Sequence, residues 1–524
     1  MSIDTDQISA MARQASQSGD WARVKAGAKR ILKRDRNSPE GHYLAGLAAK
    51  AAGLAAPAAK SFARALRLDS SRYDAAVELA GHYLASGQFA QAVTLLQQYE
   101  AQLTHSPRYL DMAGTIYTNA GLPERGLPLY KQAGELQPGV DSIEANLAAC
   151  SVFVGEIDSA KSIYRRLLDK NPNHQRNHYA LSRIETASDS THIEQMKHVL
   201  RTTNMPAERN ILLYYAIGKE LEDLEEWDEA FKYYEMAGDA AASVADYEVA
   251  TDLQLIEKII ETCDIGWLSS GSNQSAPHTS GKTPLFVVGL PRTGTTLVER
   301  IVSCHSQVES VGETYFVQNA VRRASGIRSS EGMNAAVIEA AAKKPVEAIA
   351  DEYMQAVSYK FGTKPVFIEK FPENFLYLGF IAKAYPQARI VCLKRNPIDA
   401  CFALFKQSFF RYAYTLDDLG SYYVAHDRLR HHWRKVLKDR MIEVEYESLV
   451  GDQKGQTRTL LDQLGLPFEG ACLEFHRNIT PSNTASAVQV RERMHNRSVN
   501  RWRHFAAHLQ PLQTHLASAG IALT

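Results

Sequence analysis

The stretch PLFVVGLPRTGTTLVERIVSCH, residues 284–305, decides the fold of the second half of the chain. It opens with a short apolar run at 284–288 that contains β-branched residues, which predicts a buried strand. A turn rich in glycine and proline follows at 289–294, and helical periodicity begins directly after it. We place Glu299 and Arg300 off the apolar face of that helix. A strand, a glycine turn and a helix in this order aim backbone N–H groups at an anion.

This stretch departs from the phosphate-loop pattern GxxxxGK[ST] at one position. Gly289 and Gly294 keep the spacing, but Thr295 stands where that pattern has the lysine that reaches the β- and γ-phosphates. Arg292 enters from inside the loop instead. The loop therefore predicts a phosphate or sulfate site and disfavours ATP or GTP hydrolysis. A glycine turn that binds nothing is the alternative for such a motif on its own.

The first half of the chain repeats every 34 residues. Glycines with this spacing are Gly19, Gly53, Gly87, Gly121 and Gly155. A small residue lies seven positions before each glycine, and in most units a larger apolar one lies nine after it. The period is lost near 175–208 and returns as one unit at 211–244. It resembles the tetratricopeptide repeat, in which paired helices stack into a superhelix and the glycine lies in the turn. Such arrays bind peptides, but a spacer or dimerisation arm is an open alternative.

Length and composition bound the rest. The length of 524 residues predicts more than one domain. The 59 Lys+Arg residues equal the 59 Asp+Glu residues in number, which argues against a protein whose main role is to coat nucleic acid. Its six cysteines form no CxxC pair, so we expect a reducing, cytoplasmic compartment. The N-terminus has no signal-peptide pattern, and no apolar run is long enough to span a membrane.

From the loop onward the chain resembles the sulfotransferase family. GLPRTGTT is similar to that family's loop for the 5′-phosphosulfate of 3′-phosphoadenosine-5′-phosphosulfate, and the likeness continues through most of 284–510. The nearest likeness is to tyrosylprotein sulfotransferases and to bacterial fusions of tetratricopeptide repeats with a sulfotransferase domain. The resemblance implies an α/β domain with a parallel sheet. The loop residues it assigns to the donor are Arg292, Thr293, Gly294, Thr295 and Thr296.

The resemblance also implies catalytic roles. In SVGET, 310–314, Glu313 corresponds to the base that takes the proton of the acceptor hydroxyl. In VFIEKFPEN, 366–374, Lys370 corresponds to a lysine that contacts the leaving phosphate and the sulfuryl group. Ser486 corresponds to a serine that stabilises the sulfuryl group, and Arg292 adds positive charge there. Taken alone, Glu313 could serve only a helix N-terminus and Lys370 could be a solvated loop lysine.

The remaining donor contacts implied by the resemblance are Arg395, Tyr446, Gln489 and Arg501. The two arginines correspond to the residues that hold the 3′-phosphate. One position departs from the family: the serine expected eight residues after Arg395 is Ala403, and Lys406 or Gln407 could replace its hydrogen bond.

A metal site is not expected. The histidines His426, His431 and His432 lack a second ligand motif, and a helix face explains them better. The sulfuryl-transfer scheme itself requires no metal.

Together these features predict a helical repeat domain at 1–268, a Ser/Gly-rich linker at 269–283 and a sulfotransferase domain at 284–524. The predicted reaction moves a sulfuryl group from the nucleotide donor to an acceptor hydroxyl and leaves adenosine 3′,5′-bisphosphate. Protein tyrosine is one candidate acceptor, and the repeats would recruit the acceptor or a partner protein. The alternatives are a repeat scaffold with a degenerate transferase domain and a P-loop nucleotide kinase or ATPase.

Overall fold

The computed structural model describes residues 4–270, 281–327, 332–484 and 486–523. The chain divides into two compact units, the first ending at Cys150 and the second beginning at Ser151. The second unit thus holds the last repeat helices as well as the sheet. The domain limits expected at 268 and 284 stay a prediction, and 271–280 of the expected linker lies outside the described residues.

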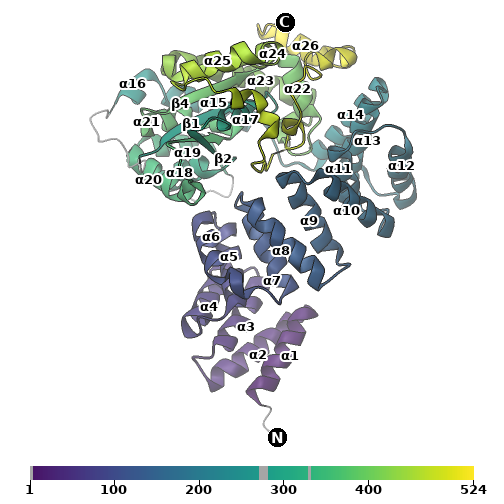
Figure 1. Ribbon diagram of the computed structural model, residues 1–524, viewed down its shortest axis with the longest axis vertical. Helices are drawn as coiled ribbons and strands as arrows, with labels where there is room; N and C mark the ends of the chain where they lie inside the picture. The colour runs from purple at the N-terminus through teal and green to yellow at the C-terminus, as the bar shows by residue number, and fades with distance from the viewer. Residues whose placement is uncertain (1–3, 271–280, 328–331, 485, 524) are drawn as a thin grey trace. The chain divides into compact units, whose positions relative to one another are not determined.

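Paired helices build the repeat region (Figure 1). They are α1 (Thr5–Gln17), α2 (Trp21–Arg34), α3 (Pro39–Ala51), α4 (Ala55–Leu68), α5 (Tyr73–Ala85), α6 (Phe89–Tyr99), α7 (Pro107–Asn119), α8 (Pro123–Leu136), α9 (Asp141–Val154), α10 (Ile157–Lys170), α11 (Gln175–Ile184), α12 (Thr191–Thr203), α13 (Ile211–Asp223) and α14 (Trp227–Val244). The predicted repeat architecture and the extra unit at 211–244 are therefore confirmed.

The 34-residue glycines lie in the turns between the two helices of each unit, with φ between 72° and 95°. In the unit formed by α13 and α14, Glu225 takes this left-handed position with φ 63°. The small residues before the turn permit close helix packing: a Cβ on Gly46 would lie 2.5 Å from the ring of Phe62. The repeat pattern therefore reflects two steric requirements: a left-handed backbone conformation in the turn, and a small residue where the two helices pack closely.

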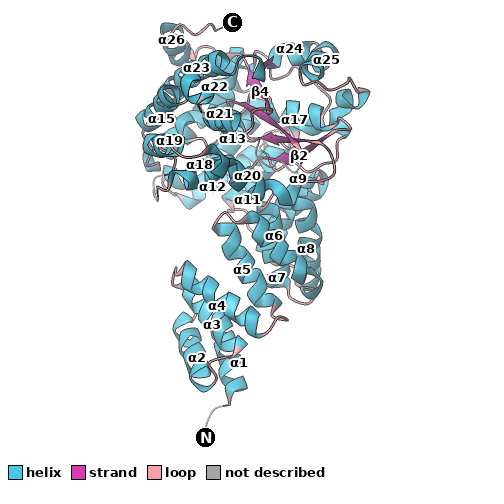
Figure 2. Ribbon diagram, turned by 90° about the vertical axis from the view of Figure 1, so that its left-hand side faces the viewer, coloured by secondary structure: helices cyan, strands magenta, loops and turns pink. Residues whose placement is uncertain are grey.

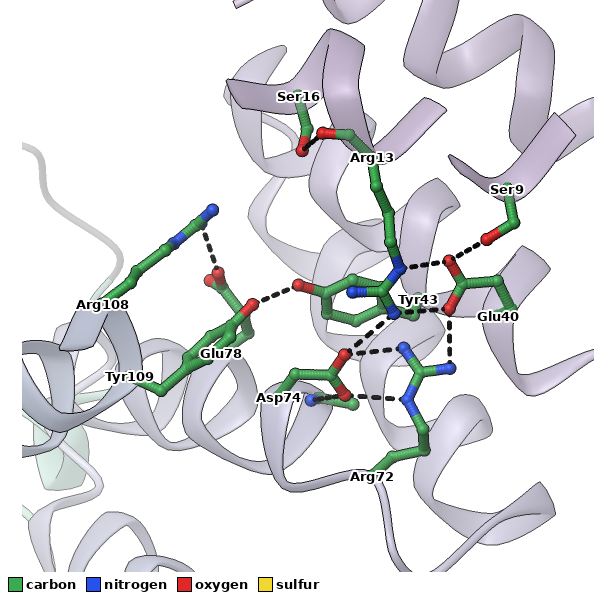
Figure 3. A network of polar contacts seen from close by, with 11 residues as sticks. Ser9, Arg13, Ser16, Glu40, Tyr43, Arg72, Asp74, Glu78, Arg108 and Tyr109 are labelled. Atoms are coloured by element: carbon green, nitrogen blue, oxygen red, sulfur yellow. Dashed lines mark hydrogen bonds and ion pairs between the residues drawn. The ribbon is translucent and has the colours of Figure 1, made fainter. Parts of the chain in front are cut away.

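A ladder of ion pairs links the first helices of successive repeats (Figure 3). Glu40, Asp74 and Glu78 supply the carboxylates, and the side chain of Glu78 is fully buried. Their cationic partners are Arg13, Lys50, Arg72 and Arg108, with nitrogen–oxygen distances of 2.6–3.3 Å. Because each carboxylate is paired, this face carries largely neutralised charge.

Two helices, α15 (Val249–Thr262) and α16 (Ile265–Ser269), precede a five-stranded sheet. The strands are β1 (Thr283–Gly289), β2 (Val308–Gly312), β3 (Val366–Lys370), β4 (Arg389–Lys394) and β5 (Met441–Glu445). Their order is β2-β3-β1-β4-β5, and every pairing is parallel. Figure 2 shows the strands gathered in one region within an otherwise helical chain. The predicted α/β fold with a parallel sheet is confirmed.

Helices connect and cover these strands. They are α17 (Thr295–Ser303), α18 (Phe316–Ser325), α19 (Ala335–Ala342), α20 (Val346–Val357), α21 (Leu378–Ala384), α22 (Pro397–Phe405), α23 (Leu416–Leu437), α24 (Tyr446–Gly451), α25 (Gln453–Gln463) and α26 (Gln510–Ser518). Apolar side chains of β1, β3 and β4 pack with α17 and α25 in one buried core. Within the described ranges, no helix combines the length and apolar character needed to cross a bilayer. All six cysteines are free thiols.

Candidate active site

The carboxyl end of every strand leads into an expected site residue. Arg292 follows β1, Glu313 follows β2, and Lys370 is the last residue of β3. Arg395 follows β4, and Tyr446 follows β5. Since parallel strands share one carboxyl edge, residues spread over more than 150 positions meet there.

The phosphate loop ends in an open helix N-terminus. Gly294, with φ 100°, is the N-cap of α17, and its position provides no side-chain cap for the first turn. Thr295 and Thr296 begin the helix and are buried, while the hydroxyl of Thr293 donates to the carbonyl of Leu290 at 2.6 Å. Uncapped amides at a helix start bind anions well.

Arg292 reaches across the loop to the C-terminal segment. Its guanidinium donates to the hydroxyl of Ser486 and to Oε1 of Gln489, the latter at 3.3 Å. Its Nε is buried without a hydrogen-bond partner. Burial, together with the charges of Arg183 and Arg395, lowers the pKa of Arg292 to about 10. Arg292, Ser486 and Gln489 therefore lie together at the loop, and the Nε of Arg292 remains as a donor without a partner.

Lys370 lies between two carboxylates. Its ammonium contacts Glu313 directly and lies 3.8 Å from Oε2 of Glu299, and its side chain is fully buried. Burial raises the pKa of Glu313 above its usual value, although Lys370 acts in the opposite direction. A carboxyl with a raised pKa is a more effective proton acceptor than an ordinary glutamate.

Arg395 joins the loops after β1 and β4. It donates to the carbonyl of Arg292 at 2.8 Å and to that of Ser498 at 2.6 Å, and its guanidinium lies 4.9 Å from the ring centre of Tyr446. That ring also packs against Gly294, where an added Cβ would lie 2.6 Å from it. The Nε of Arg395 is buried without a partner. The predicted donor residues Arg395 and Tyr446 therefore adjoin the loop.

Arg501 lies in a different environment from the one expected for a phosphate ligand. Its Nε donates to Oε1 of Glu222 at 3.0 Å, and its guanidinium lies 4.9 Å from the ring centre of Trp227. Both partners belong to the last repeat. The segment that carries Arg501 is fixed by Asp399, which accepts hydrogen bonds from the backbone N–H groups of Asn500 and Trp502.

Gln407 does not replace the hydrogen bond of the serine expected at position 403, because its side-chain amide donates to the backbone carbonyl of Ala403 at 3.3 Å. Lys406 instead binds Glu222, with distances of 2.8 and 2.9 Å to the two carboxylate oxygens. Of the three histidines, His426 is buried against Phe375, with ring centres 4.1 Å apart.

Sequence reasoning missed several of these residues. Glu299 and Arg300 were expected off the apolar face, yet they are only 7% and 3% exposed. Glu299, on α17, is buried where it accepts from the hydroxyl of Ser310 and faces Lys370, the last residue of β3. Arg183 and Glu222 lie in repeat helices. The repeat period does not predict that Arg183 affects the pKa of Arg292 or that Glu222 pairs with Lys406 and Arg501.

The arrangement suits a doubly anionic ligand. Buried guanidinium nitrogens of Arg292 and Arg395 lack partners, and the first turn of α17 is open. Buried polar groups normally find a partner, so these donors are suited to bind anionic oxygens. These observations fit phosphate and sulfate groups of the kind that the family's donor carries. Among the described residues, no group of three or more His, Cys, Asp or Glu side chains could hold a metal ion.

Comparison with known proteins finds similarities in both halves of the chain. The model of the Sulfotransferase family matches residues 284–470, and a tetratricopeptide-repeat model matches 49–115. Residues 284–470 are thus similar to the sulfotransferase family, and the matched segment contains Arg292, Glu313, Lys370, Arg395 and Tyr446.

Two relatives match long stretches of this chain. An uncharacterised protein of Aquifex aeolicus is 25% identical over 417 residues, which cover 78% of this chain and 54% of that protein. A protein-tyrosine sulfotransferase of Drosophila melanogaster is 24% identical over 271 residues, or 50% of this chain and 52% of the relative. The matches to these two relatives thus span about half of their lengths. A sulfotransferase domain from the curacin biosynthetic pathway aligns with TM-score 0.33 and 13% identity, covering 46% of this chain and 99% of that domain.

Proposed function

We propose that the protein transfers a sulfuryl group from 3′-phosphoadenosine-5′-phosphosulfate to an acceptor hydroxyl. The acceptor oxygen forms a bond to sulfur, and the bond between sulfur and the 5′-phosphate oxygen breaks. The hydroxyl proton passes to Glu313, and adenosine 3′,5′-bisphosphate leaves. Lys370, Arg292 and Ser486 offset the charge that develops on the sulfuryl oxygens and the leaving phosphate.

One observation carries this proposal. The base Glu313 contacts Lys370 at the ends of β2 and β3, and Arg292 contacts Ser486 beside the open first turn of α17. A proton acceptor and anion-binding donors therefore lie at one edge of one sheet. Sulfuryl transfer to a hydroxyl needs both.

The acceptor is proposed from similarity alone. The matched relative of Drosophila melanogaster is a protein-tyrosine sulfotransferase, so a tyrosine hydroxyl is the first acceptor to test. We further propose that the repeats recruit the acceptor or a partner protein, in a cytoplasmic setting.

A thermal-shift experiment tests the donor assignment. Adenosine 3′,5′-bisphosphate should raise the melting temperature more than ATP at equal concentration, because a ligand stabilises the state it binds. Replacing Arg395 by glutamine should abolish most of the shift. The matched control is Arg389→Gln, which removes an exposed arginine at the opposite end of β4. A larger shift with ATP would contradict the proposal and favour the nucleotide kinase or ATPase alternative.

The scaffold alternative predicts a different pattern. A degenerate transferase would bind the bisphosphate and transfer sulfate to no acceptor in a broad pool. The intact pair of Glu313 and Lys370 favours an active enzyme. The missing serine at Ala403 is the feature that favours the scaffold.

A further inference from the structure

The last repeat supplies a carboxylate to the cations expected to hold the donor. Glu222, near the end of α13, is only 6% exposed. Its carboxylate accepts from Lys406 at 2.8 and 2.9 Å, from Arg501 at 3.0 Å and from the hydroxyl of Tyr234 at 2.8 Å. Burial opposes ionisation of Glu222, yet Lys406 and Arg501 lower the pKa of its carboxyl below the usual value. The group is therefore a buried anion between two cations.

Other contacts fix the same repeat helices against the transferase domain. Arg501 and His504 both lie on the ring of Trp227, and the ring planes of Trp227 and His504 stack with centres 4.2 Å apart. On α11, the hydroxyl of Tyr179 bonds that of Ser408 at 3.1 Å. All of these residues belong to the compact unit that begins at Ser151. The position of Glu222 is thus determined by packing on several sides.

The two cations on Glu222 have a particular significance. Arg501 is the residue that family resemblance assigns to the 3′-phosphate, and Lys406 lies three positions after Ala403, where the resemblance expects a phosphate-binding serine. A 3′-phosphate at these side chains would share their donors with the carboxylate, which already accepts from the Nε of Arg501 and from the ammonium of Lys406. Two anions that share two cations compete for their hydrogen bonds and repel one another.

We propose that Glu222 of the last repeat competes with the donor's 3′-phosphate for Arg501 and Lys406, so that the last repeat sets donor affinity. This inference rests on the proposed function, because it assumes a nucleotide with a 3′-phosphate. It also makes the last repeat part of the proposed donor site, beyond any role of the repeats in recruiting an acceptor.

Calorimetric titration of the full chain tests the inference with two ligands. Adenosine 3′,5′-bisphosphate carries the 3′-phosphate, and adenosine 5′-monophosphate lacks it. Glu222→Gln should tighten bisphosphate binding by about tenfold, since a hydrogen bond to a charged group commonly changes an equilibrium by this factor or more. Monophosphate binding should change by less than about twofold. The matched control is Glu226→Gln, which removes an exposed carboxylate four residues away.

The outcomes separate this inference from the function on which it rests. Bisphosphate binding that is unchanged or weakened in Glu222→Gln overturns the competition, and weakening would mean that Glu222 positions the cations. Wild-type protein that binds neither nucleotide overturns the proposed function as well. If Glu222→Gln does not fold, Arg501→Gln serves instead: it should weaken binding of the bisphosphate and spare that of the monophosphate. Equal effects on both ligands would reject the inference.

Discussion

Asp399 offers a sensitive test of how the proposed donor site is held in place. Its carboxylate is 2% exposed and accepts from the backbone N–H groups of Asn500 at 2.6 Å and Trp502 at 3.0 Å. Asp399→Asn keeps the shape but replaces one acceptor oxygen with an NH₂ group, which faces a backbone donor. Each hydrogen bond to a charged group contributes about 1.5–3 kcal/mol. Losing one and weakening the other should reduce the local stability of 498–502 by about 3 kcal/mol.

Hydrogen–deuterium exchange reads this change directly. A loss of about 3 kcal/mol should accelerate exchange in a peptide covering 498–502 by roughly 100-fold, because each 1.4 kcal/mol corresponds to a factor of ten. Binding of adenosine 3′,5′-bisphosphate should weaken in parallel, since Arg395 is held by the carbonyl of Ser498. Asp417→Asn, at an exposed position in the first turn of α23, is the control. Acceleration below about threefold would refute the reasoning.

Further predictions concern two glycines and one carboxyl. Gly294→Ala, at φ 100° and with its new Cβ 2.6 Å from the ring of Tyr446, should lower the free energy of unfolding by about 1–3 kcal/mol and weaken bisphosphate binding in a titration. Gly238→Ala should destabilise the protein by a similar amount in thermal melts, because its Cβ would collide with the backbone carbonyl of Tyr414. The raised pKa of Glu313 means that this proposed base is still protonated at pH values where an ordinary glutamate is ionised. The rate of transfer should therefore rise with pH through a value above 4.5, and a pH–rate profile without such a rise would contradict the assignment.

The features that could be predicted from sequence are local or periodic. The 34-residue spacing reflects turns and helix seams that recur in each repeat, so Gly19 and the glycines that follow it at this spacing predict the repeat architecture. The phosphate loop is likewise contained in one contiguous stretch, and it appears in the structure as β1, a turn and α17. Both follow from steric demands that neighbouring residues impose on the backbone.

The features that sequence could not provide depend on distant partners. Arg501 and Glu222 are 279 residues apart, and only the folded second unit brings them together. Glu299 on α17 is buried beside Lys370, which belongs to β3. Helical periodicity describes only one helix, so it places this carboxylate off the apolar face and gives no sign of its partner on β3.

Transfer of labelled sulfate from 3′-phosphoadenosine-5′-phosphosulfate to a panel of hydroxyl acceptors tests the central claim most directly. The panel should include tyrosine peptides, glycans and small alcohols. We predict transfer by the full chain, a loss of at least about 100-fold in Glu313→Gln as expected for removal of a general base, and little change in Glu339→Gln, an exposed carboxylate on α19. Equal turnover by wild type and Glu313→Gln, or no transfer by the wild type to any acceptor, would contradict the account.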